Sequence, residues 1–182
     1  EIRHGRYFAR VGTEETLQSL HRPGGLRRLR VLLLEREELI AAAERAVTRH
    51  DPEIAANAAL AATRALVERG PVDAGLSLIG RVLGLKGVRP RLRARLLLAR
   101  AGALRTAGSP GAAAEDYGEA ITLAQDTGLE SVEAEALAGA GALHLAAGRL
   151  RSARHNLQAA LGRFEELGDG WGAARARSAL AW

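Results

Sequence analysis

Four prolines divide the middle of the chain at nearly equal intervals. They are separated by 19, 19 and 20 residues and lie at Pro52, Pro71, Pro90 and Pro110. Proline is tolerated in the first turn of a helix, where its missing N–H would have had no partner. Asp51 and Ser109, residue types that favour the N-cap, come directly before two of them. Each interval therefore predicts one helix of about 15 residues followed by a short turn.

The same spacing continues without proline in the second half of the chain. Turn glycines follow one another at the same interval, at Gly128, Gly148 and Gly168. Glycine commonly ends a helix because it adopts left-handed backbone conformations without strain. Two helices with their turns therefore make a unit of about 40 residues, a length typical of stacked helical hairpins.

Side chains at matching positions of successive units agree with this repeat. In the second helix of each pair, small residues align with small ones and large apolar residues with large ones. The pairs that keep their class are Ala113 with Ala153, Tyr117 with Leu157, Ala120 with Ala160 and Ile121 with Leu161. One pair, Ala124 with Phe164, changes size. Each hairpin is therefore expected to bury one face on the next hairpin in line.

Composition restricts how such helices pack. Hydrophobic residues make up 47% of the 182 residues, but aromatic residues only 3%, and there is no Met. Alanine and leucine must therefore fill the core, which suits closely approaching helices. The lack of Cys excludes disulfides and thiolate zinc sites. No apolar run approaches the roughly 20 residues that span a bilayer and no leader opens the chain, so we expect a soluble, cytoplasmic protein.

The two ends depart from the repeat. Residues 1–50 lack the spacing and contain two helix-compatible stretches, RHGRYFARVGTEETLQSL and PGGLRRLRVLLLEREELIAAAERAV. We interpret them as a helical pair that caps the N-terminal end. Residues 169–182 form the first helix of a unit that has no second helix. Because the chain starts without Met and stops inside this unit, we expect a piece of a longer protein. The predicted divisions are 1–50, 51–88, 89–128, 129–168 and 169–182.

The best-preserved unit, EALAGAGALHLAAGRLRSARHNLQAALGRFEELGD, resembles the tetratricopeptide repeat in its longer form. The matching positions are Leu137, Ala140, Gly141, His144, Gly148, Leu150, Ala153, Leu157 and Ala160. At His144 the chain departs from the family, which usually has a large aromatic residue there. The resemblance covers residues 90–182 well and 52–88 loosely. It implies an all-α fold, a right-handed superhelical solenoid of antiparallel helical hairpins, led here by the N-terminal helical cap.

The N-terminal third resembles a second pattern. RHGRYFARVG, followed by LRRLRVLLLEREELIAAAERAVTRHDPEIAANAAL, looks like the segment that follows the ATPase and winged-helix modules of large bacterial signal-transduction ATPases. In those regulators of transcription, tetratricopeptide arrays act as the sensor or partner-binding arm. The resemblance therefore implies such an arm, without ATP binding of its own.

The residues that catalysis or metal binding would need are missing or badly spaced. GRVLGLKG has the wrong spacing for a phosphate-binding loop and lacks its hydroxyl residue. AGAGAL lacks a third glycine and follows a helix start, so its glycines are better explained by packing. The five histidines have no metal-ligand spacing, although His144 and His155 lie on the two members of one hairpin. We therefore expect no enzyme activity, no cofactor and no metal.

Charge is segregated along the chain. Eight basic residues and no acid lie between Ala74 and Ala114, and seven acids without Lys or Arg lie between Thr106 and Gly148. We expect the helix that carries Arg91 and Arg95 to neighbour the one that carries the acids of residues 130–135. Either the two sectors neutralise each other, or a charged groove attracts a charged partner. Nucleic-acid binding is disfavoured because no aromatic residue accompanies the basic sector.

These features together predict a non-catalytic scaffold that binds a protein or peptide. The tetratricopeptide resemblance places the partner on the free face of the first helices. The residues it implies are Glu135, Ala138 and Ala142 in the best unit, Arg175, Ser178 and Trp182 in the last, and Arg95 or Leu96 in the unit before. The alternative is a self-association module, in which the bare end near Trp182 pairs with another copy.

Overall fold

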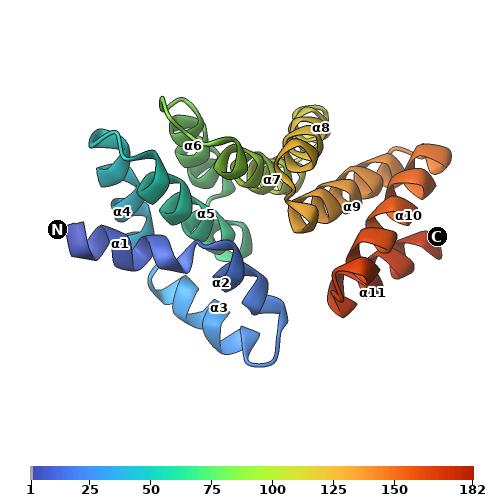
Figure 1. Ribbon diagram of the computed structural model, residues 1–182, viewed down its shortest axis with the longest axis horizontal. Coiled ribbons are helices and arrows are strands. Elements are labelled where there is room, and N and C mark those ends of the chain that lie inside the picture. The colour runs from blue at the N-terminus through green and yellow to red at the C-terminus, as the bar shows by residue number, and fades with distance from the viewer. Residues whose placement is uncertain (1) are drawn as a thin grey trace. The chain divides into compact units, whose positions relative to one another are not determined.

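A computed structural model describes residues 2–182, with side chains from Tyr7 onward (Figure 1). These residues form helices and connecting turns and no strand, so the all-α prediction is confirmed for the part of the chain that is described. They fall into two compact units, one ending at Leu92 and the other beginning at Arg93.

The first unit is built around one buried helix. Its helices are α1 (Ile2–Val11), α2 (Glu14–Gln18), a 3-10 turn (Ser19–His21), α3 (Gly25–Leu34), α4 (Arg36–Thr48), α5 (Pro52–Arg69) and α6 (Val72–Leu83). Helices α1, α3, α4 and α6 all pack on α5. The run AANAALAAT in α5 is buried, and its small side chains let several helices approach at once.

The N-terminal segment is more divided than the sequence suggests. Where two helices are predicted in residues 1–50, the described part of this segment forms four and a 3-10 turn. The second predicted helix is interrupted at Glu35, whose backbone (φ −88°, ψ 8°) leaves the helical region. The interruption lets α3 and α4 pack separately on α5. The predicted pair is thus corrected to a small helical cluster.

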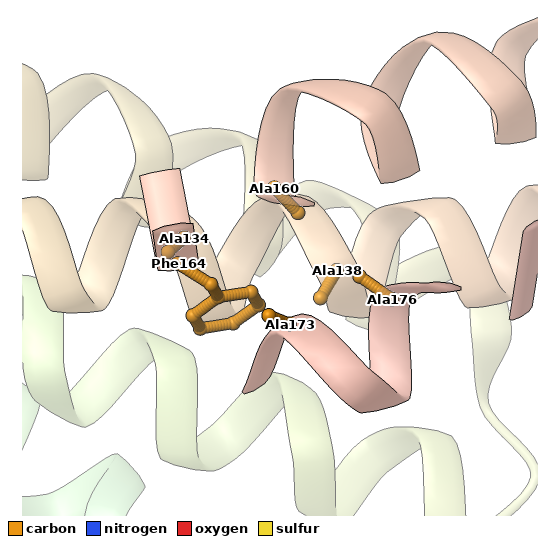
Figure 2. Close-up of a cluster of buried hydrophobic side chains, with 6 residues drawn as sticks. All are labelled: Ala134, Ala138, Ala160, Phe164, Ala173 and Ala176. Atoms are coloured by element: carbon orange, nitrogen blue, oxygen red, sulfur yellow. The ribbon is translucent and has the colours of Figure 1, made fainter. Parts of the chain in front are cut away.

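The second unit follows the predicted spacing. It contains most of α7 (Pro90–Thr106), then α8 (Pro110–Thr127), α9 (Glu130–Ala146), α10 (Leu150–Glu166) and α11 (Gly170–Leu180). Helices α8 to α11 pack in chain order, and α11 also contacts α9. Figure 2 shows a buried cluster in which the Phe164 ring lies among alanines of α9, α10 and α11.

The turns of this unit share one geometry. Four evenly spaced glycines have positive φ angles of 77°, 64°, 69° and 67°: Gly108, Gly128, Gly148 and Gly168. After each glycine, the next N–H donates to a carbonyl five residues earlier, at 2.9, 2.8, 2.9 and 2.8 Å. This is the Schellman arrangement, which satisfies helix-end carbonyls. His50 takes the glycine's place before α5, with φ 57°.

Candidate partner-binding face

Tyr117 of α8 reaches across α9 at Gly139. A methyl group added at Gly139 would overlap the end of the Tyr117 ring, including its hydroxyl oxygen, so the absence of a side chain makes room for the ring. Tyr117 itself is buried, with 4% of its surface exposed. Its hydroxyl group is thus held at one place on α9.

Three charged side chains from three helices act electrostatically on that hydroxyl group. The Arg105 guanidinium of α7 and the charges of Glu135 on α9 and Arg175 on α11 all influence the pKa of this hydroxyl group. Arg175 binds Glu135 through both guanidinium nitrogens, each 3.3 Å from a carboxylate oxygen. We call Arg105, Tyr117, Glu135 and Arg175 the Tyr117 cluster. It contains two cations and one anion, so its formal charge is +1.

Burial is the largest influence on the pKa of Tyr117. Desolvation raises the pKa of Tyr117 above its ordinary value of 10.0, while the positively charged Arg105 guanidinium acts in the opposite direction. The hydroxyl therefore stays protonated at neutral pH and keeps a polar O–H beside the charged side chains.

The structure brings some of the predicted binding residues together and separates others. Glu135 and Arg175, predicted from matching positions of two units, form the ion pair just described. Ala138 is 7% exposed inside the cluster of Figure 2, so it belongs to the core and not to a free face. The remaining predicted residues are distributed as follows: Leu96 is buried, Arg95 and Ala142 are half-buried, and Ser178 and Trp182 are exposed.

Arg105, Tyr117 and Gly139 were not among the predicted residues. Tyr117 aligns with Leu157 in the repeat, which indicates a core residue and hides its polar end. The glycines of AGAGAL do serve packing, because Gly139 faces Tyr117 and Gly141 faces Leu157. A tyrosine aligned with an aliphatic residue was the one signal in the sequence for the cluster.

The basic sector pairs with α8. Arg93 on α7 is 2.8 Å from Glu119, and Arg100 makes two 2.6 Å hydrogen bonds to the buried Asp116. The hydrogen bond with Asp116 raises the pKa of Arg100, so the guanidinium group stays charged. These contacts run from α7 to α8, while the expected proximity of Arg91 and Arg95 to the acids of residues 130–135 stays a prediction. They support neutralisation of the two sectors inside the chain.

The described residues contain no His, Cys, Asp and Glu group that would hold a metal. His144 accepts a 2.9 Å hydrogen bond from Arg149 at the turn after α9. Among the helices described, none is both long and apolar enough to cross a bilayer.

The arrangement defines an all-α protein of packed helical hairpins with a polar cluster on one unit. Comparison of the chain with protein-family models, curated proteins and solved structures finds no match.

Tyr117 should make the second unit sensitive to high pH. Because its folded pKa is raised, the unfolded state loses the phenolic proton first; the stabilisation is complete below pH 10 and is lost as pH rises through the folded pKa. We expect Tyr117→Phe to lose less stability than the parent above pH 10. A Tyr7→Phe background leaves Tyr117 as the one tyrosine, whose absorbance titration gives its pKa directly. Equal pH dependence of the two proteins would contradict the assignment.

Proposed function

We propose that the chain is a non-catalytic scaffold that binds a protein or peptide segment at the Tyr117 cluster. The observation that supports this most directly is the ion pair between Arg175 of α11 and Glu135 of α9. The charges of this pair and of Arg105 on α7 also act on the buried Tyr117 hydroxyl. These helices are the first members of successive hairpins, so each unit of the repeat supplies one charged side chain.

The chemistry of the cluster suits recognition better than reaction. The Glu135–Arg175 pair is partly exposed, with side-chain exposures of 33% and 43%, so a partner has access to both charges. At 3.3 Å each hydrogen bond is long for a charged pair, which leaves room for exchange with a competing carboxylate or guanidinium group. Exposed pairs of this kind contribute roughly 0–1 kcal/mol to stability, so little is lost when they exchange partners.

The two sequence resemblances extend this proposal. They are consistent with a tetratricopeptide superhelix of right-handed twist that serves as the partner-binding arm of a larger bacterial signal-transduction ATPase in the cytoplasm. The regular helix beginnings and repeated turns support the tetratricopeptide-like repeat. The proposed role as an arm of a larger signal-transduction ATPase depends on sequence pattern alone.

Reversing one ion pair tests the site. A displayed library of random linear peptides is selected on the wild type and on the double variant Glu135→Arg/Arg175→Glu, which keeps an ion pair but inverts its polarity. We expect the wild type to enrich peptides that the variant binds at least about tenfold more weakly, because the charges that meet the peptide have changed sign.

A matched control swaps an exposed pair elsewhere. Arg64→Glu/Glu68→Arg inverts an ion pair on α5 of the first unit and should leave the enriched peptides unchanged. Failure of the wild type to enrich any peptide, or equal binding by both reversed variants, would remove the Tyr117 cluster as the binding site.

A further inference from the structure

Helix α3 exposes large aliphatic side chains together. Leu26, Val31 and Leu34 have 85%, 51% and 77% of their surface exposed. At 100° per residue these three positions, with Arg27 and Arg30, occupy one continuous arc of about 140°. Figure 1 draws α3 at the edge of the first unit. We call these five residues the α3 face.

The α3 face carries charge of one sign. Arg27 and Arg30 are exposed and have no ion pair within the part of the chain that is described. No acid occurs from Thr16 to Leu34. Single exposed aliphatic residues are ordinary, whereas a group of them on one arc marks an interaction surface. The surface that covers this arc should therefore be smooth and acidic.

Helix α8 presents such a surface. Its exposed side carries Gly111, Ala114, Gly118 and Thr122, spaced as one helical stripe. A methyl group added at Gly118 would meet nothing within 4 Å, so packing inside the chain does not require a glycine there. Glycine in a helix interior is unfavourable unless another surface approaches closely.

The edge of this stripe is acidic. Glu115 and Asp126 are exposed, and neither has an ion pair in the described structure. Glu119, between them, is bound to Arg93. No basic residue lies on α8. We call Gly111, Ala114, Glu115, Gly118, Thr122 and Asp126 the α8 face.

We propose that the α3 face of one copy of this chain docks on the α8 face of a second copy. The aliphatic side chains of α3 cover the small-residue stripe, and Arg27 and Arg30 meet the acids along its edge. The surfaces differ, so the contact is heterologous, and it either closes into a dimer or small ring or continues into a chain of copies. This assembly goes beyond the proposed binding function and does not involve the Tyr117 cluster.

Sedimentation velocity over a concentration series tests the proposal. The sedimentation coefficient of the wild type should rise as its concentration is increased to the high micromolar range. This association should be weaker at high salt, because salt screens exposed charges. Two variants, Arg27→Glu/Arg30→Glu and Glu115→Arg/Asp126→Arg, should each stay monomeric. Leu26→Ser/Leu34→Ser should also weaken association, by about tenfold or more.

Mixing the two charge variants is the decisive measurement. One variant has two acidic faces and the other two basic faces, so an equimolar mixture should recover association that neither shows alone. The replaced side chains are exposed and unpaired within the described structure, so circular dichroism should show folded protein in every case. Trp182→Ala, at the opposite end of the chain, should associate like the wild type.

Four outcomes would overturn the proposal. They are a wild type that stays monomeric at every concentration, charge variants that associate alone, a mixture that stays monomeric, and loss of association on Trp182→Ala alone. A further experiment measures binding of the protein to vesicles of anionic phosphatidylglycerol. Wild-type binding that Arg27→Glu/Arg30→Glu abolishes, without self-association in buffer, would assign the α3 face to a membrane surface instead.

Discussion

Replacing Phe164 by alanine is expected to lower the free energy of unfolding of the second unit by about 3–5 kcal/mol. The Phe164 side chain is 1% exposed and lies among alanines of three helices, none of which is long enough to fill the space it would leave. Gly172 of α11 has no side chain where the ring lies, so the ring also sets how closely α11 approaches α10.

The measurement is urea unfolding followed by tryptophan fluorescence. Both tryptophans of the chain, Trp171 and Trp182, belong to the second unit, so the signal reports that unit. Leu150→Ala is the matched control, because Leu150 is 61% exposed and its truncation should change the free energy by about 0.5 kcal/mol or less. A Phe164→Ala change as small as that of the control would show that the cluster does not hold the unit together.

Gly12→Ala should have the largest effect in the first unit, about 3 kcal/mol of lost stability. A methyl group at Gly12 would overlap the backbone carbonyl of Asn57 in α5, and a backbone atom inside a buried helix cannot turn aside as a side chain does. The end of α1 must then move away from α5, on which it packs.

This displacement is measured by amide hydrogen exchange of α1 and α5. The matched control is Gly80→Ala in α6 of the same unit, where an added methyl group meets nothing within 4 Å. That change should stabilise the unit by about 0.5–1 kcal/mol, because alanine favours a helix and restricts the unfolded chain. Unchanged protection of α1 in Gly12→Ala would mean that α1 is not held against α5.

The helix beginnings were predictable because their signals are local. Helices α5, α7 and α8 start at Pro52, Pro90 and Pro110, as the proline spacing predicts, and α6 starts one residue after Pro71. The turn glycines were predictable for the same reason, since a positive φ is a property of one residue and its neighbours. The break at Glu35 had no such signal, because neither Gly nor Pro occurs there.

The candidate site was only partly predictable. Aligning the units placed Glu135 and Arg175 on corresponding positions, and they pair. The alignment also placed Ala138 on the free face, whereas that side chain is buried. Helix α9 is lined by small apolar residues on nearly every side, so polarity gives no indication of its rotation. The approach of Tyr117 to Gly139 depends on how α8 packs on α9, and no local sequence pattern predicts that packing.

The equal geometry at Gly108, Gly128, Gly148 and Gly168 has a consequence for how such a chain changes in length. Loss or duplication of the hairpin between Gly128 and Gly168 would join one left-handed glycine to another with nearly the same φ, 64° against 67°. The glycine at the junction would therefore keep its left-handed conformation. We therefore expect a change in the number of hairpins to strain the turns little, and its cost to lie in the packing of Gly139 against Tyr117 and of Phe164 against Gly172.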